Sequence, residues 1–279
     1  MKRLIPLAAF GAVMTGAAAA FAERLTGPQR EAGLGLPRDV SLDGYRIDSL
    51  LMSTAVLTTI LFVIMIVWLV WALVVHRDGK HKAEYDTGDG KKHVTTAVMI
   101  SSAVFLIVDG NLFLNAMVDM SEAFWNFPTS DETVKIEINA QQWAWRARYS
   151  GTDGEWNTAD DVVTLNDVRV PEKTPVVLQL ASVDVIHSFF LPNLRVKTDA
   201  MPGVINRLWF QAQETGQFEI ACAQHCGVHH YKMRGVLTVL SDEDYADWLR
   251  RMSAEATRAY DPNDEDARWG WEWDREEAN

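Results

Sequence analysis

Two long apolar runs stand out in the first half of the chain. Residues 50–75 include no charged side chain, and a helix that rises about 1.5 Å per residue would let them cross the ~30 Å of bilayer hydrocarbon. Trp68 and Trp71 lie near the end of this run, where interfacial tryptophans are common. A second apolar run covers about residues 94–117. The pattern predicts a membrane-spanning helix over each range.

The segments that flank these runs predict how the chain crosses the membrane. The loop 76–93 carries basic residues that the positive-inside rule places in the cytoplasm: Arg77, Lys80, Lys82, Lys91 and Lys92. Residues 1–22 combine basic residues with an alanine-rich apolar run, which predicts a signal peptide cleaved before Glu23; a retained anchor is the alternative. Residues 23–48 are then an exported N-terminal arm. Both signals place the outer ends of the hairpin 49–120 on the extracytoplasmic side.

Polar side chains interrupt the second run: Asp109, Asn111 and Asn115. An ionisable group is expensive in hydrocarbon and therefore faces protein or water. Counted by helical rise, Asp109 falls in the outer part of the bilayer. Two interpretations remain open, which are solvation at the interface and a polar contact with a neighbouring membrane subunit.

After residue 120 the pattern changes to short alternating segments. Residues 133–139 alternate apolar and polar side chains with a period of two, as in a half-buried strand. Similar segments, bounded by Gly, Pro, Asp and Asn turns, cover residues 162–165, 175–180, 208–212, 217–221 and 235–240. Many short strands at such intervals predict a β-sandwich or barrel of Greek-key type over residues 121–241.

Residues 242–279 predict a short helix and an acidic tail. Asp242 and Glu243 favour a helix start after Ser241. One face of this helix is apolar, with Tyr245, Trp248 and Leu249. The charged tail carries tryptophans at alternate positions, Trp269, Trp271 and Trp273, which suggest a contact with a partner.

Composition adds two points to this picture. The 279 residues allow one or two domains, and the formal net charge of −12 gives the exported part a negative field. The acidic segment 152–161 offers carboxylates of the kind that bind calcium, but its spacing is not that of an EF-hand loop. A solvated loop is therefore the prediction for this segment.

The densest group of candidate metal ligands lies near the end of the predicted β domain. Cys222 and Cys226 are the only two cysteines in the sequence; His230 and Met233 follow them, and His187 lies upstream. Thiolates, imidazoles and a thioether are soft donors, which favour copper over zinc or magnesium. They are too many for one blue-copper ion and suffice for two copper ions bridged by both sulfurs. A disulfide is the alternative in an oxidising compartment.

This spacing resembles that of subunit II of haem–copper cytochrome oxidases, the subunit that carries the binuclear copper centre CuA. In that family a histidine precedes Cys-x-x-x-Cys-Gly-x-x-His-x-x-Met by about 35 residues, as it does here. The resemblance implies these ligands: His187, Cys222, the backbone carbonyl of Gln224, Cys226, His230 and Met233. In the family, both cysteines bridge the two copper ions, and each histidine binds one ion. The methionine is the weak axial ligand of one copper, and the carbonyl binds the other. The implied fold is a two-helix transmembrane hairpin, an all-β cupredoxin-like Greek-key barrel and a short C-terminal helix.

A second matching segment is Gln142-Trp143-Ala144-Trp145. On the residues alone, the alternate aromatic side chains are equally compatible with a packed face. In the family, the first tryptophan of this segment is the exposed point where cytochrome c delivers its electron, which implies that role for Trp143. Residues 196–203 also resemble the family's turn near the junction with subunit I.

The chain departs from the family in several places. Gln224 replaces a glutamate that binds magnesium in many relatives, and an amide is a poorer magnesium ligand, so the magnesium site at the subunit interface is doubtful. The second span opens at His93 without the family's glutamate, so no role in proton uptake is carried over. His225 and His229 fall outside the ligand spacing and are treated as bystanders. No Cys-x-x-Cys-His is present, which excludes a fused haem c domain.

The resemblance implies a subunit of a proton-translocating cytochrome c oxidase in the bacterial inner membrane, with its copper domain in the periplasm. Such a subunit takes electrons from cytochrome c and passes them to haem, held only by subunit I, for the reduction of oxygen. Expected partners are subunit I, other oxidase subunits, cytochrome c and membrane lipid, with no nucleic acid. The alternatives are the CuA subunit of a nitric oxide reductase and a copper-delivering chaperone, in whose thioredoxin-like fold a helix follows the cysteines.

Overall fold

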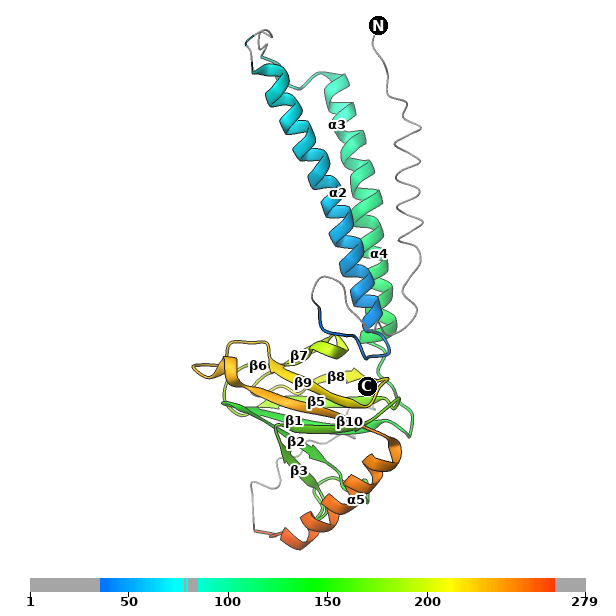
Figure 1. Ribbon diagram of the computed structural model, residues 1–279, viewed down its shortest axis with the longest axis vertical. Helices are drawn as coiled ribbons and strands as arrows, with labels where there is room; N and C mark the ends of the chain where they lie inside the picture. Colours follow the sequence, from blue (N-terminus) through cyan, green and yellow to red (C-terminus); the bar gives the residue numbers. More distant parts are fainter. Residues whose placement is uncertain (1–35, 78, 80–84, 264–279) are drawn as a thin grey trace. The chain divides into compact units, whose positions relative to one another are not determined.

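The computed structural model describes residues 36–77, 79 and 85–263, which form two compact units (Figure 1). One unit contains the apolar helices within Arg46–Glu122. The other, within Thr26–Tyr45 and Ala123–Asn279, contains the strands, the C-terminal helix and the segment before the first apolar helix. The predicted signal peptide, Lys80, Lys82 and the three tail tryptophans lie outside the described residues.

Both predicted spans are helical. The first is α2 (Gly44–His76), and the second is one helical stretch, Lys91–Phe124, in which α segments alternate with π turns. In chain order the parts of this stretch are α3 (Lys91–Val104), η2 (Phe105–Asp109), α4 (Gly110–Asp119) and η3 (Met120–Phe124). Both helices are long and apolar enough to cross a membrane, as predicted, although the sequence pattern did not indicate the π turns.

Ion pairs join the outer ends of the two helices. Arg46, near the start of α2, pairs with Asp119 at 3.1 Å and with Glu122 at 3.0 Å. Because these carboxylates lie at the end of the second helical stretch, the two helices form a hairpin. Asp109 is exposed at the end of the π turn η2, and its contact with a neighbouring subunit stays a prediction.

The segment just before α2 is anchored on the β domain, which its irregular sequence did not indicate. The backbone N–H of Val40 donates to the Asn193 carbonyl at 2.9 Å, and its own carbonyl accepts from Gln213 at 2.8 Å. The Val40 side chain is 0% exposed and belongs to the core. The sequence around Pro37 and Val40 has no periodic pattern. Hydrogen bonds to distant parts of the chain, and not local sequence, place this part of the predicted arm along the β domain. The helix also starts earlier than the predicted end of the arm, at Gly44.

The β domain consists, in its described part, of two five-stranded sheets. The first has the order β3-β2-β1-β5-β8 and contains β1 (Val134–Gln141), β2 (Ala144–Tyr149), β3 (Val162–Leu165), β5 (Val176–Ser182) and β8 (Asn206–Phe210). The second has the order β4-β10-β9-β6-β7 and contains β4 (Asp167–Pro171), β6 (His187–Leu191), β7 (Val196–Ala200), β9 (Gly216–Cys222) and β10 (Arg234–Leu240). The predicted all-β cupredoxin-like domain is confirmed.

Side chains from both sheets meet in one core. Trp145, Leu178, Phe189, Ile220 and Leu237 are each 0% exposed and belong to the same buried cluster. Every strand with a predicted alternating pattern contributes to a sheet, because burying one face of each sheet against the other removes the apolar side chains from water.

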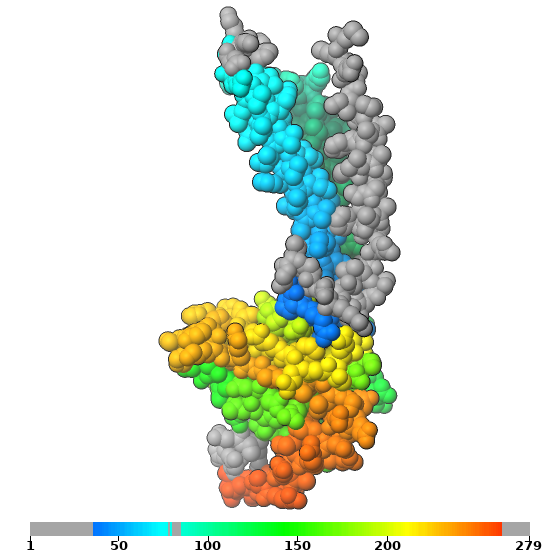
Figure 2. All heavy atoms as spheres, in the orientation of Figure 1, coloured from blue at the N-terminus to red at the C-terminus, as the bar shows by residue number. Residues whose placement is uncertain are grey.

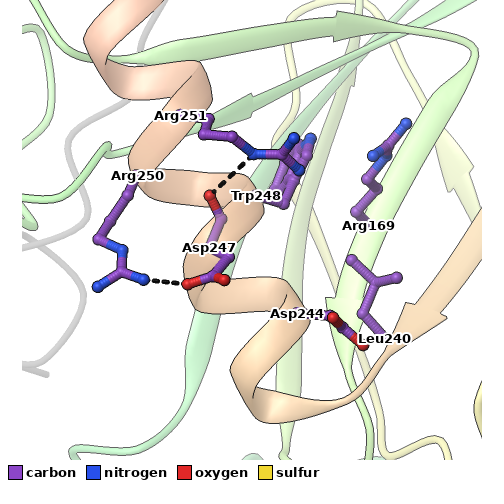
Figure 3. A pocket seen from close by; sticks show the side chains of 7 residues that line it. All are labelled: Arg169, Leu240, Asp244, Asp247, Trp248, Arg250 and Arg251. Atoms are coloured by element: carbon purple, nitrogen blue, oxygen red, sulfur yellow. Dashed lines mark hydrogen bonds and ion pairs between the residues drawn. The ribbon is translucent and has the colours of Figure 1, made fainter.

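The predicted C-terminal helix is α5 (Asp242–Ala259). Ser241 is its N-cap and accepts a hydrogen bond from the Asp244 N–H at 3.2 Å, and Trp248 packs on the β domain with 4% of its surface exposed. A hollow of about 630 Å³ lies beside this helix (Figure 3). Its lining offers carboxylates and guanidinium groups, with Arg250 already paired to Asp247, and none of the soft donors predicted to bind metal.

The acidic segment 152–161 is more than a solvated loop. Its Asp161 carboxylate accepts from Nε of Arg148 at 2.9 Å, and Asn157 accepts from the same guanidinium at 2.7 Å. Asp160 accepts from the backbone N–H of Thr152 at 2.7 Å. The segment is a loop with residues 152–155 exposed, as predicted, but the sequence did not indicate its attachment to Arg148, because that cation lies on the strand β2.

Candidate metal centre

Strand pairing brings together ligands that are far apart in sequence. His187 begins β6 and Cys222 ends β9; these strands pair antiparallel, with Phe189 opposite Cys222. The chain then makes a loop that returns as β10, and the Cys222 N–H donates to the Met233 carbonyl at 3.2 Å, which closes the loop. The second cysteine, the second histidine and the methionine all lie within this loop. Figure 2 shows the loop, coloured between yellow and orange, at the surface of one end of the β domain.

The predicted donor atoms converge on one place. The Sγ atoms of Cys222 and Cys226 lie 3.7 Å apart, and Cys226 Sγ lies 3.7 Å from both His230 Nδ1 and Met233 Sδ. His187 Nδ1 lies 3.1 Å from Met233 Sδ. The ligand atoms of His187, Cys222 and Cys226 all lie within 4.8 Å of one another.

The backbone carbonyl that was expected to act as a ligand also faces this cluster. The carbonyl oxygen of Gln224 lies 3.2 Å from Cys222 Sγ, so all six predicted donors share one site. The cysteines are free thiols, and their sulfurs are farther apart than the ~2.05 Å of a disulfide. The donors are thiols, imidazoles, a thioether and one carbonyl, which fits copper and leaves no carboxylate ligand for magnesium or calcium.

The site is buried on one side and open on the other. His187, Cys226 and Met233 are 0%, 2% and 1% exposed, while Cys222 is half-buried. Burial raises the pKa of Cys226, and the neighbouring Cys222 raises it further, to about 12. Burial also acts to raise the pKa of Cys222, but hydrogen bonds from His187 and from the Ser188 N–H outweigh it and bring this pKa to about 6. In the metal-free site, therefore, Cys222 ionises first.

Hydrogen bonds also connect the histidine at the base of the site to a carboxylate. Burial acts to lower the pKa of His187, but its bonds with Cys222 and Asp184 outweigh burial and raise the pKa. Burial acts to raise the pKa of Asp184, but bonds from His187 and from the backbone N–H groups of Val185 and Gln142 lower it overall. Sequence reasoning missed Asp184; its position three residues before His187 was the available signal.

Trp143 contacts the ligand loop directly. Its indole Nε1–H donates to the Cys226 carbonyl at 3.2 Å, and the Gln142 side chain donates to the same oxygen at 2.8 Å. Gly227 has φ of +117°, and a Cβ there would lie 3.0 Å from Gln142 Nε2 and 3.3 Å from the Trp143 ring. A glycine is therefore required where this segment packs on the loop. His229 packs edge-on against Trp143, with ring centroids 4.5 Å apart.

Trp145, His225 and His229 lie near the site but outside the group of candidate ligands. Trp145, the second tryptophan of the matching segment, is buried in the core, with its ring centroid 6.0 Å from that of His187. His225 packs edge-on against His230 at 5.5 Å. Neither His225 nor His229 belongs to the donor group found among the described residues. The strand β10 follows the ligand loop, whereas the chaperone alternative required a helix there.

Two helices that are long and apolar enough to cross a membrane, together with a β domain that gathers thiols, imidazoles and a thioether, fit a membrane protein with a candidate metal site. A family model described as "Cytochrome C oxidase subunit II, periplasmic domain" matches residues 153–240. Over these residues the chain is similar to cytochrome c oxidase subunit II.

Three curated relatives show the extent of this similarity. The alternative cytochrome c oxidase subunit 2 of Bradyrhizobium diazoefficiens is 35% identical over 147 residues, covering 45% of this chain and 53% of that one. The cytochrome c oxidase subunit 2 of Cereibacter sphaeroides is 28% identical over 235 residues, covering 74% of each. The match to a subunit 2 of Alkalihalophilus pseudofirmus is 37% identical and covers 34% of that chain. The chain thus spans about half or less of the length of the first curated relatives that it matches.

Among solved structures, the periplasmic domain of subunit II of cytochrome oxidase of Bradyrhizobium japonicum is similar at 28% identity. The match has a TM-score of 0.41 and covers 47% of this chain and 99% of that one.

Proposed function

We propose that this chain is the electron-accepting subunit II of a respiratory cytochrome c oxidase, with two copper ions held as a CuA centre. Such a centre would take electrons from cytochrome c and pass them to haem in subunit I, for the reduction of oxygen to water. The observation that carries the proposal is the convergence of the two thiols, two imidazoles, thioether and carbonyl within one half-buried cluster.

Each donor has a distinct place in the proposed centre. The thiolates of Cys222 and Cys226 would be shared by both metal ions, while His187 and His230 would each bind one. Met233 and the Gln224 carbonyl would supply the weaker ligands. A copper pair held by these residues would supply one-electron transfer.

The protein contributes a rigid setting for this exchange. His187 is held on a strand, Cys222 ends a second strand, and Met233 is buried where a third begins. Ligands fixed by sheet hydrogen bonds change position little when the charge of the centre changes. The buried side of the site excludes water, which keeps the surrounding polarity low and the rearrangement small.

Trp143 is the proposed electron-accepting point. Its indole donates a hydrogen bond to the Cys226 carbonyl. Only the covalent bonds of Cys226 itself separate that carbonyl from the sulfur, so the route for an electron is short. The ligand loop that Trp143 contacts also carries the exposed side chains of Val228 and Tyr231, at 78% and 68% exposure. Such a surface suits a brief encounter with a soluble cytochrome c, because it combines apolar contact with easy release.

The remaining assignments follow from the family. We place the chain in the bacterial inner membrane, with the copper domain in the periplasm and the helices beside subunit I and other oxidase subunits. A magnesium site at that junction stays doubtful, because Gln224 offers an amide. A nitric oxide reductase is the second candidate; assays of the purified complex with oxygen and with nitric oxide separate the two.

The test uses the full-length chain loaded with copper, together with its Trp143→Ala variant. We expect two copper ions per chain and electron paramagnetic resonance lines split by two equivalent copper nuclei. The variant should keep this spectrum and lose at least tenfold in its rate of reduction by cytochrome c, because the route to Cys226 is removed. One copper per chain would overturn the centre, and an unchanged rate in the variant would overturn the role of Trp143.

A further inference from the structure

Asp184 uses its two carboxylate oxygens to hold two different parts of the site. Its Oδ1 lies 2.9 Å from His187 Nε2, and its Oδ2 accepts the backbone N–H of Gln142 at 2.6 Å. The carboxylate is itself fixed, because Oδ1 also accepts from the Val185 N–H at 2.6 Å and from the Ser182 hydroxyl at 3.2 Å. Its side chain is 28% exposed, so it is only partly in contact with solvent.

The contact with His187 selects one form of the imidazole. An ionised carboxylate only accepts hydrogen bonds, so Nε2 must carry the proton and donate to it. In the neutral ring, Nδ1 then holds the free lone pair. This nitrogen faces Met233 Sδ at 3.1 Å, on the side where the sulfurs gather. The carboxylate therefore presents the ring to metal in the form that can bind it.

The contact with Gln142 fixes the segment that carries Trp143. The Gln142 side chain and the Trp143 indole both donate to the Cys226 carbonyl. Asp184, His187, Met233, Cys226 and Gln142 thus form a closed ring of contacts. The same carboxylate holds one metal ligand on one side of the ring and the electron-accepting segment on the other.

We propose that Asp184 is a positioning residue that sets the tautomer of His187 and holds the Gln142–Trp143 segment against Cys226. This role rests on the proposed function of the site. The rival explanation is that Asp184 acts only as one of the surface acids that attract a basic cytochrome c, since the chain carries a net charge of −12.

An Asp184→Asn variant separates these explanations. An amide has one acceptor and one donor group, so it cannot accept from both His187 and Gln142. If its oxygen faces Gln142, its NH₂ faces Nε2 and drives the ring proton to Nδ1, the nitrogen that must bind metal. If the amide oxygen instead faces Nε2 of His187, the amide NH₂ faces the Gln142 N–H. Both of these groups are donors, so no hydrogen bond forms between them. The first orientation therefore puts the proton on the wrong nitrogen of His187, and the second loses the hydrogen bond with Gln142.

The experiment uses the full-length chain, in the metal-free state and after loading with copper. Nitrogen NMR of histidine-labelled metal-free chain, at a pH where the ring is neutral, should show His187 protonated at Nε2 in the parent and shifted toward Nδ1 in Asp184→Asn. Copper affinity, measured by competition with a chelator, should fall by roughly 10- to 100-fold. The copper hyperfine pattern should change, and Asp184→Glu should restore part of each property.

A charge-matched control is Asp131→Asn, which removes an exposed acid in a turn before β1 and should behave as the parent. The proposal is overturned if Asp184→Asn keeps the tautomer, copper affinity and spectrum and only raises KM for cytochrome c. It is also overturned if the parent ring is protonated at Nδ1. A parent that binds a single copper ion would overturn the proposed function instead, because the NMR result does not depend on copper.

Discussion

At the scale of single residues, a buried arginine inside the β domain pairs with two carboxylates. The side chain of Arg148 is 0% exposed and pairs with Glu137, also 0% exposed, at 3.3 Å, and with Asp161. Its guanidinium also lies 5.6 Å from the centre of the Trp156 ring. Removing one member of a buried ion group leaves uncompensated charge in a medium that solvates it poorly, which is strongly destabilising.

We therefore expect Arg148→Met to destabilise the β domain by about 3–5 kcal/mol and to lower its thermal midpoint by roughly 10 °C. Circular dichroism of the full-length chain in detergent measures this change. The control is Arg250→Met, whose ion pair with Asp247 is exposed, with side chains at 68% and 51%; it should change stability by less than about 1 kcal/mol. Equal effects of the two substitutions would contradict the argument.

At the scale of elements, the start of α2 depends on its first residue, Gly44, and on two residues of the segment that precedes it. The Ser41 hydroxyl accepts from the Gly44 N–H at 2.7 Å and donates to Asp39 Oδ1 at 2.8 Å. A Cβ at position 44 would lie 2.3 Å from that carboxylate oxygen, so only glycine fits there without a shift. This arrangement ends the pairing with the β domain and begins the helix within a few residues.

Ser41→Ala should remove this cap at a cost of about 1 kcal/mol. The amide of Gly44 should then exchange with solvent about fivefold faster, since about 1 kcal/mol corresponds to that factor. Hydrogen exchange read by NMR or mass spectrometry checks the result. Ser41→Thr keeps the hydroxyl and should exchange at nearly the parent rate, and equal exchange in the alanine variant would show that the cap adds nothing.

At the scale of the whole molecule, charge should govern how fast a partner arrives. The chain has a net charge of −12 and a sequence pI of about 5.0. A negative field accelerates the approach of a basic cytochrome c, and dissolved salt screens that field over about 10 Å at 0.1 M.

The rate of copper reduction by a basic cytochrome c should therefore fall by roughly tenfold between low and physiological ionic strength. Stopped-flow measurements on the full-length, copper-loaded chain test this. Reduction by a small uncharged reagent is the control and should not change with salt. If the cytochrome c rate were equally insensitive, apolar contact around Trp143 would be the main cause of docking.

Much of this molecule could be predicted from local pattern. The two apolar runs, the alternating segments and the acidic start of α5 each depend on neighbouring residues, and each was found as a helix or strand. The motif from Cys222 to Met233 also lies within one short stretch of chain, so the spacing of the residues was enough to predict most of the candidate metal ligands. Local pattern missed the pairing of the irregular segment around Val40 with the β domain and the contact of Asp161 with Arg148 on the strand β2.

The sequence by itself determined that the chain has two apolar spans, a β-rich part and a soft donor set, because hydrophobic period and ligand chemistry are properties of the residues. Tertiary structure alone decided which atoms meet. The pairing of β6 with β9 placed His187 beside Cys222, and the fold brought Asp184 and Gln142 together from positions 42 residues apart. Such contacts depend on how strands pair across long stretches of chain, and that pairing is set by the shared core of the two sheets.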